Sequence, residues 1–498
     1  MKTKEITHNK DSAYSNRNPL QNLKIYICIG CILIFVPCTD IKAADNDTIS
    51  PWSVLMAENL MENPSIAAGP ALNYYVFATA MKGLRELFEV SGDSIVYHYI
   101  AEIVDDNLSY YEHITGLPNY DMDFINGASL ILFMYSQTGD PKYIPAIDST
   151  LKYLNSMPRT PDGGIYHKGA LSYYRLQLDD LYMIGPFMAE YGKIFNKPEV
   201  YKDAVKQALL FDHYMRDTIT GLMYHAWYDG SQGATAGCTP YFWGRGIGWV
   251  TMGLVDMLDF LPEGYSGRDS VIGMFQTLAK AVADVQDDKL KVWWQVLNMT
   301  ENPSNYPESS ASCMFVYSIA KGIKRGYLDN SFTNCIEKGM QGIMDNFLEI
   351  VDENIINITH LCPGQAPSFT LSQYFLGIGT NGHAVGPFIE ANLETALLNI
   401  NPVINVQKDK YYDDFSIAVY PNPFSGETTL SLCLPETEYI TLDVFNIQGS
   451  KVKRLYQGIK PAGWYSFPFK PSDNINNAYI CRLQAGNRII IKKLIRFK

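Results

Sequence analysis

Two adjacent aspartates, Asp179 and Asp180, open a mostly apolar stretch that continues through Phe187 and Met188. A carboxyl group beside so apolar a stretch is a candidate for a raised pKa, because burial disfavours its charged form. A raised pKa keeps an acid protonated near neutral pH, which is what a general acid requires. The alternative role is capping, because Asp is preferred at the start of a helix.

Two further polar clusters interrupt apolar helices. The segment 121–127 contains Asp123 just before the apolar helix predicted for 128–135, and Asp123 or Asn126 is either a cap or a site residue. The Gly pair at 163–164 predicts a turn, and His167 and Lys168 follow it in a loop expected at one mouth of the fold.

The third group combines aromatic and basic residues. His225 ends the segment G-L-M-Y-H at 221–225, and Trp243 and Arg245 lie in the run W-G-R-G-I-G-W. Glycines around one Arg allow close approach to a ligand, and Trp offers a stacking surface; a buried Arg with structural hydrogen bonds is the equal alternative. The run is not a dinucleotide loop, because no strand precedes it and the glycine spacing is wrong.

Several chemistries are excluded or disfavoured. The mature chain has no nucleophile elbow, P-loop or zinc-like Cys or His pair. The eight His of the full chain are dispersed, so we expect no metal. The chain of 498 residues has a net charge of −12, which gives no reason to expect binding of nucleic acid.

The elements that must position these residues are helical from about 52 to 400, with apolar residues three or four apart. Start signals recur there 47 to 72 residues apart, enough for two helices and their loops. Such a period predicts six helical hairpins, which we interpret as an (α/α)6 barrel over 52–400.

The ends of the chain have other compositions. An apolar run of about 13 residues follows Lys24, too short for a membrane span of roughly 20, so residues 1–43 are predicted to be a secretory signal peptide rather than a lipoprotein anchor at Cys38. We expect no transmembrane helix in the mature protein. After a linker at 401–412, short alternating strands predict a small β-sandwich over 413–498.

This tail resembles the C-terminal sorting domain of proteins exported by the type IX secretion system. The resemblance rests on V-Y-P-N-P at 419–423, N-I-Q-G at 446–449 and the closing K-K-L-I at 492–495. It implies that the type IX machinery is a partner and that the protein is secreted or reaches the cell surface. The alternative is an ordinary β-sandwich that binds carbohydrate.

The helical region resembles glycoside hydrolase family 105, the unsaturated rhamnogalacturonyl hydrolases, and more distantly the unsaturated glucuronyl hydrolases of family 88. The matching segments are P-R-T-P-D-G-G-I-Y-H-K with L-D-D-L-Y-M, the W-G-R-G-I-G-W run, and E-S-S-A-S with the preceding Trp294. The resemblance implies an (α/α)6 barrel without a cofactor. Gln177 departs from the pattern, since the family often has Trp there.

The resemblance also implies roles for individual residues. Asp179 would be the catalytic acid/base and Asp123 the second carboxylate. Substrate-binding positions fall on a larger set, namely His167, Lys168, His225, Trp243, Arg245 and Trp294. The implied substrate is an unsaturated uronic-acid oligosaccharide made from pectin by a lyase. Alternative substrates are glycosaminoglycan or algal uronides. Alternative functions are those of an inverting glycosidase and of a non-catalytic glycan-binding protein.

Charge is unevenly distributed along the chain. Residues 44–412 hold 23 basic and 42 acidic groups, so the expected enzyme body carries −19. A body of this charge cannot attract an anionic uronide from a distance. We therefore expect a few local cations at the site, with Arg245 and Lys168 as the candidates.

Overall fold

The structure is a computed structural model of the chain. It describes residues 49–117, 121–167, 174–352, 354–375, 377–402, 415–420, 422–424, 426–434, 437–460, 463–471, 478–486 and 488–496. The predicted signal peptide, most of the predicted linker and Lys168 lie outside these ranges. The helices and strands are counted over these residues.

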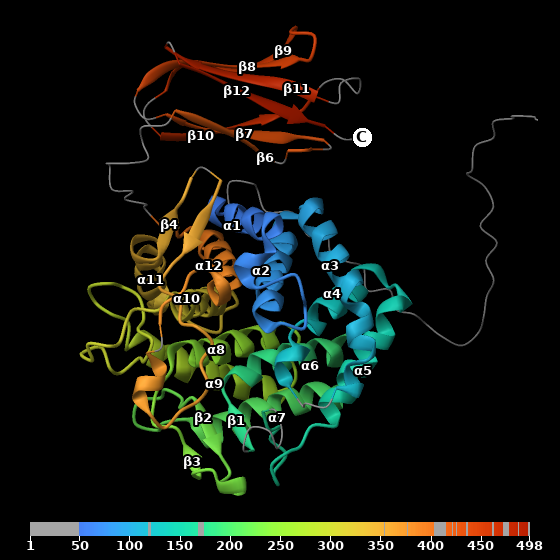
Figure 1. The fold of residues 1–498 in the computed structure, drawn as a ribbon, viewed down its shortest axis with the longest axis vertical. Coiled ribbons are helices and arrows are strands. Elements are labelled where there is room, and N and C mark those ends of the chain that lie inside the picture. The colour runs from blue at the N-terminus through green and yellow to red at the C-terminus, as the bar shows by residue number, and fades with distance from the viewer. Residues whose placement is uncertain are drawn as a thin grey trace, which may run out of the picture. The chain divides into compact units, whose positions relative to one another are not determined.

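Twelve α-helices form the first part of the described chain (Figure 1). Their bounds are α1 (Pro51–Glu62), α2 (Tyr75–Ser91), α3 (Ser94–Glu112), α4 (Ala128–Thr138), α5 (Ile144–Asn155), α6 (Asp179–Ile194), α7 (Pro198–Met215), α8 (Gly244–Leu258), α9 (Ser266–Ala283), α10 (Ser309–Lys324), α11 (Thr333–Asn346) and α12 (Val385–Leu397). The sequence signals explain several starts: Asp93 caps α3 by accepting from the Ile95 amide at 2.8 Å, and Pro198 is the first residue of α7.

The even-numbered helices form an inner ring. α2, α4, α6, α8, α10 and α12 contact one another in this cyclic order, and α12 contacts α2 again. α6, α8, α10 and α12 are buried along nearly their whole length, as expected for helices that are covered on all sides. The odd-numbered helices pair with this ring from outside, which gives the predicted arrangement of six helical hairpins.

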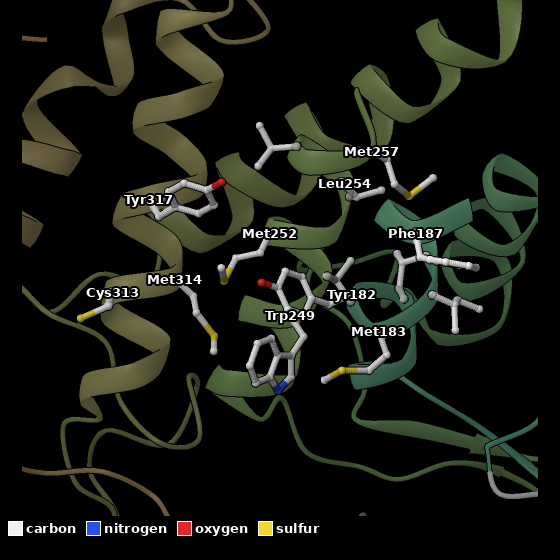
Figure 2. Packing of buried hydrophobic residues seen from close by; sticks show 14 of the residues in the cluster. Tyr182, Met183, Phe187, Trp249, Met252, Leu254, Met257, Cys313, Met314 and Tyr317 are labelled. Carbon is white, nitrogen blue, oxygen red and sulfur yellow. The ribbon is translucent and has the colours of Figure 1, made fainter. Parts of the chain in front are cut away.

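Aromatic and sulfur-containing side chains fill the space between the inner helices (Figure 2). Tyr182 of α6 lies against Trp249 of α8, with ring centroids 4.9 Å apart. Met183, Met252 and Met314 are almost completely buried in the same cluster. Methionine adapts to irregular gaps, which suits a core where several helices converge.

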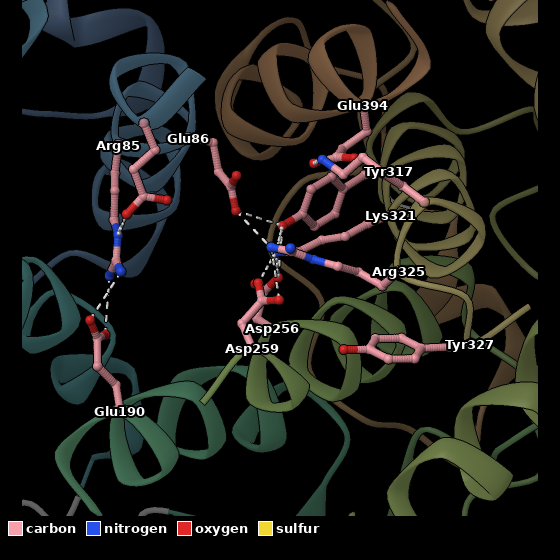
Figure 3. Close-up of polar contacts among 12 residues, drawn as sticks. Arg85, Glu86, Glu190, Asp256, Asp259, Tyr317, Lys321, Arg325, Tyr327 and Glu394 are labelled. Carbon is pink, nitrogen blue, oxygen red and sulfur yellow. Dashed lines mark hydrogen bonds and ion pairs between the residues drawn. The ribbon is translucent and has the colours of Figure 1, made fainter. Parts of the chain in front are cut away.

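A second buried feature is a network of charges towards the C-terminal ends of the inner helices (Figure 3). The ammonium group of Lys321 on α10 lies 3.0 Å from Glu86, 2.8 Å from Asp256 and 3.0 Å from Asp259. Lys321 is only 2% exposed. The network therefore ties α10 to α2 and α8 where the apolar packing ends.

Short strands lie between the helices. β1 (Arg175–Gln177) pairs with β2 (Ala226–Tyr228), which pairs with β3 (Gly237–Cys238). β4 (Leu348–Ile350) pairs with β5 (Ile356–Ile358). All of these pairs are antiparallel, and β1 leads directly into α6, so this small sheet positions the start of that helix.

The C-terminal part is an all-β unit of two antiparallel sheets. One has the order β10-β7-β6 and the other β12-β11-β8-β9. The strands are β6 (Ser416–Tyr420), β7 (Thr428–Leu434), β8 (Glu438–Asn446), β9 (Lys451–Lys460), β10 (Gly463–Phe469), β11 (Ala478–Ala485) and β12 (Arg488–Ile495). One apolar cluster that includes Leu430, Leu442 and Leu483 draws on both sheets, as in the predicted sandwich.

None of the described helices is both long and apolar enough to span a membrane.

Candidate active site

A cavity of about 370 Å³ opens where the N-terminal ends of α2, α4 and α6 meet. The residues that line it are Asn73, Tyr74, Tyr75, Asp121, Asp123, Phe124, His167, Arg175, Gln177, Asp179, Gln365 and Ala366. Three of the residues predicted from the sequence, Asp123, His167 and Asp179, are therefore brought together. A groove of about 430 Å³ between α7 and α9 has no carboxyl group among its lining residues, so the candidate chemistry belongs to the first cavity.

Asp179 is the first residue of α6 and is 6% exposed. The His225 Nε2 atom lies 3.7 Å from its Oδ2, an electrostatic contact longer than a hydrogen bond. Burial by itself raises the pKa of Asp179, but His225, His167 and Arg245 together bring that pKa below its usual value. The expectation of a raised pKa is therefore wrong for Asp179, because the chain folds three basic side chains around it.

Asp180, the neighbouring acid, has a different environment. Its side chain is fully buried, and its Oδ1 lies 2.7 Å from Nδ1 of His167. Burial raises the pKa of Asp180, and this outweighs the opposite effect of His167. Asp180 does not line the cavity, but it contacts His167, which does.

Asp123 belongs to a 3-10 turn, Met122–Ile125, that precedes α4. The cap of this turn is Asp121, whose Oδ1 accepts from the Asp123 amide at 3.1 Å. The side chain of Asn126 donates to Thr79 Oγ1 at 3.0 Å, which links the turn to α2. Asp121 thus caps this turn, and neither Asp123 nor Asn126 caps α4, whose N-cap is Gly127. Asp123 lines the cavity with Asp179.

His225 and Trp243 lie behind the cavity wall. His225 is fully buried, its ring centroid is 4.2 Å from that of Trp243, and its Nδ1 lies 2.9 Å from the hydroxyl of Tyr374. The indole of Trp243 donates to Oε1 of Gln295 at 3.3 Å. Neither residue lines the cavity as described, and His225 reaches the chemistry through Asp179.

Arg245 is also buried, at 1% exposure. Its Nη1 donates to the carbonyl of Cys362 at 2.6 Å and its Nη2 to that of Pro363 at 2.7 Å. The same segment reaches the cavity two residues later, at Gln365. Arg245 is thus a buried Arg with structural hydrogen bonds, as in the alternative to a ligand-binding role. Its positive charge acts on Asp179 from behind the cavity wall.

Trp294 lies apart from the other predicted residues. Its indole donates to Oδ2 of Asp287 at 2.9 Å, and it does not line the cavity. The adjacent Gln295 is nearer to the site, since its Nε2 donates to the carbonyl of Tyr374 at 3.0 Å. Lys168 lies outside the described residues.

Sequence reasoning missed several residues of the site. Tyr75 lines the cavity, and its hydroxyl lies 2.8 Å from Nε2 of the buried His383. Arg175 and Gln177 also line it, and the Arg175 Nε donates to Gln177 Oε1 at 2.9 Å. The signal for the last two was the alternation of Arg175, Leu176 and Gln177, which places the two polar groups on one face of a short strand.

A ring of helical hairpins with two carboxylates in a cavity at the inner helices' N-terminal ends is an architecture found among glycoside hydrolases. Residues 53–398 match Glycosyl Hydrolase Family 88, and the chain belongs to this family. Residues 418–496 match a secretion system C-terminal sorting domain, so the protein carries the signal for export by the type IX system.

Individual relatives agree with this assignment. The chain is 24% identical over 271 residues to the unsaturated rhamnogalacturonyl hydrolase YesR of Bacillus subtilis, covering 53% of this chain and 74% of that protein. It is 22% identical over 337 residues to an unsaturated 3S-rhamnoglycuronyl hydrolase of Alteromonas sp., covering 64% and 78%.

Among solved structures, the chain is similar to a family 105 glycoside hydrolase of C. acetobutylicum, with 28% identity and a TM-score of 0.63 over 69% of this chain and 98% of that one. The prediction of a helical hydrolase related to families 105 and 88, followed by a β-sheet sorting domain, is confirmed.

Proposed function

We propose that this member of the unsaturated glucuronyl and rhamnogalacturonyl hydrolases removes the terminal 4,5-unsaturated uronic acid from pectin-derived rhamnogalacturonan oligosaccharides. The observation that carries the proposal is the placement of Asp179 and Asp123 in one cavity with His167 beside them. The similarity to the rhamnogalacturonyl hydrolase of Bacillus subtilis supports this choice of polysaccharide.

In the proposed reaction, protonated Asp179 donates its proton to C4 of the uronate. Water forms a bond to C5 of the resulting cation and returns a proton to Asp179, so the carboxyl group ends as it began and one water has been added. The hemiketal then opens and releases the neighbouring sugar. One acid/base suffices, and Asp123 orients a ring hydroxyl or raises the pKa of the donor by like charge.

The lowered pKa of Asp179 means that this group is ionised in the free enzyme at neutral pH. A bound uronate brings a second negative charge and excludes water, and both effects raise the pKa of a nearby carboxyl group. Substrate binding is thus expected to protonate Asp179. Its carboxyl group therefore carries the proton that it donates when the double bond is in place.

The remaining site residues have supporting roles in this proposal. His167 and Lys168 bind the substrate's carboxylate and hydroxyl groups. His225 adjusts the charge of Asp179, and Arg245 holds the wall at 362–363. Trp243 supports the ring of His225 rather than stacking directly on a sugar.

Replacing Asp179 by Asn tests the proposal. In the Asp179→Asn variant, we expect turnover of an unsaturated rhamnogalacturonan disaccharide to fall at least about a hundredfold. Turnover is measured as loss of the enol absorbance. Asp180→Asn is the comparison variant, because Asp180 is also a buried acid but does not line the cavity, and it should lose less turnover than Asp179→Asn. Near-normal rates for the Asp179 variant would sink the assignment. Equal loss in both variants would remove the distinction between the two acids.

A conventional inverting glycosidase is the competing mechanism for two carboxylates in one cavity. Such an enzyme cleaves saturated substrates and needs both carboxylates. A panel of lyase-generated oligosaccharides and their saturated counterparts, read for absorbance loss and released sugar, separates the two. Binding without any reaction would indicate a glycan-binding protein instead.

For export, we propose that residues 1–43 are removed as a signal peptide and that residues 413–498 are recognised by the type IX machinery. The sorting-domain match supports this route to the cell surface or the medium. Mass spectrometry of the exported protein from a host with that system gives both cleavage positions. An N-terminus upstream of Ala44 would contradict the predicted signal peptide.

A further inference from the structure

The cavity wall contains a basic side chain that the proposed mechanism does not use. Arg175 and Gln177 are two residues apart on β1 and both line the cavity, whereas Leu176 between them is fully buried. The Nε of Arg175 donates to Oε1 of Gln177 at 2.9 Å. A strand places such alternate residues on one face, so the pair forms a short polar strip beside Asp179.

Arg175 is held from other directions as well. Its guanidinium lies 5.9 Å from the ring centroid of Tyr228, the residue opposite it on β2. The backbone carbonyl of Arg175 accepts from the His167 amide at 2.8 Å. An Arg positioned by a hydrogen bond, a ring and the backbone loses less freedom on binding a ligand than one that extends into solvent.

The charge of the cavity indicates what this side chain is suited to bind. Three of the lining residues are acids, namely Asp121, Asp123 and Asp179. Among the described lining residues, Arg175 is the one with a permanent positive charge, since His167 is charged only when protonated. An anionic saccharide entering this cavity needs a compensating cation, and a guanidinium matches the geometry of carboxylate and sulfate oxygens.

We propose that Arg175, oriented by Gln177, is a specificity-determining residue that binds an anionic group of the oligosaccharide. The inference rests on the proposed function for the identity of the substrate. The anionic group is either the carboxylate of the unsaturated uronate or a sulfate ester on the sugar that follows it. Gln177 acts by positioning Arg175.

Steady-state kinetics with two substrates separate these sources. One is an unsaturated uronyl-rhamnose disaccharide with a neutral rhamnose, and the other carries a sulfate ester on that rhamnose. For Arg175→Gln we expect KM to rise about ten- to a hundredfold, with kcat within about threefold of wild type. A rise for both substrates assigns the uronate carboxylate, and a rise for the sulfated one alone assigns the sulfate.

Three further variants control the interpretation. Arg175→Lys keeps the charge and should recover part of the affinity, and Gln177→Met should give a smaller rise in KM. Lys280→Gln removes one positive charge from an exposed pair with Asp284 on α9 and should change neither constant. A KM within twofold of wild type for Arg175→Gln on both substrates would overturn the proposal. If Arg175→Gln does not fold, Gln177→Met decides, and a KM within twofold of wild type on both substrates would overturn the proposal.

Failure of the proposed function has a different signature. If wild-type protein consumes neither double bond, the hydrolase assignment fails, and the role of Arg175 is still measured by calorimetry. The dissociation constants of both disaccharides are then compared for Asp179→Asn with and without Arg175→Gln. Weaker binding in the double variant supports the anion site, and equal binding contradicts it.

Discussion

Replacing Lys321 by Met tests whether the buried charge network holds the inner ring together. The ammonium group of Lys321 is surrounded by three carboxylates within 3.0 Å. Water does not solvate it, because Lys321 is 2% exposed. Met keeps the length of the side chain but removes the charge. The variant therefore leaves Glu86, Asp256 and Asp259 facing one another without their cation.

The size of the effect follows from burial. Removing one partner from a buried ion pair costs about 3–5 kcal/mol. The three carboxylates are 14% to 21% exposed, and Arg325 still pairs with Asp259 at 3.0 Å. We therefore expect the lower end, about 3 kcal/mol of the free energy of unfolding at pH 7. The exposed Lys280–Asp284 pair is the matched control, and Lys280→Met should cost at most about 0.5 kcal/mol.

The loss should also depend on pH. Burial by itself raises the pKa of Glu86, but Lys321 brings it down to about 2. A carboxyl group with a lowered pKa stabilises the fold above its unfolded value near 4.5, and this contribution disappears as the pH falls towards 2. The deficit of Lys321→Met should consequently be largest at pH 7 and smaller at pH 4.

Urea unfolding followed by tryptophan fluorescence measures these values, because six of the seven tryptophans lie between residues 52 and 294. Adding Asp256→Asn to Lys321→Met should recover part of the loss, since it removes one unpaired charge. Equal midpoints for wild type and Lys321→Met at pH 7 would refute the reasoning. So would a deficit that does not shrink on acidification.

Two other predictions concern single titrating groups. His225→Asn removes a side chain that lowers the pKa of Asp179, so the decline of kcat/KM at high pH should move to higher pH, and an unchanged pH profile would contradict the role given to His225. Burial, Glu62 and Asp93 raise the pKa of Glu58 to about 7, so the folded state loses stability as the pH rises from 4.5 to 7, where the unfolded chain ionises first. Glu58→Gln should therefore raise the free energy of unfolding at pH 8 by at most about 3 kcal/mol, and with it the melting temperature. At pH 4 the melting temperature should be unchanged. Lower stability of the variant at pH 8 would refute this.

The fold was largely predictable because its signals are local. Apolar spacing and start residues such as Asp93 act within one or two turns of helix, and the number of hairpins follows from their period. The short alternating strands predicted after the linker are likewise found, among them β7, β8 and β11. Alternation and turn residues also act over a few positions.

The site was predictable only in part. The convergence of Asp123, His167 and Asp179 followed from matching motifs. The lowered pKa of Asp179 did not, because His225 comes from a segment 46 residues further along the chain. The glycines around Arg245 indicated close approach by another group, but that group is the backbone at Cys362 and Pro363, more than a hundred residues away. Contacts of this kind arise from tertiary packing and have no local signal.

The alternation of inner and outer helices has an electrical consequence. Tyr75, Asp179 and the turn before α4 line the cavity, Arg245 and Glu308 contact the segment that leads to its wall, and His383 contacts Tyr75. All six inner helices therefore begin near the site, where each presents the positive end of its dipole. At the opposite end of α10, Lys321 and Lys324 lie in the last turn, where cations complement the negative end. The helix dipoles thus partly offset, at the cavity, the net charge of −19 on the enzyme body.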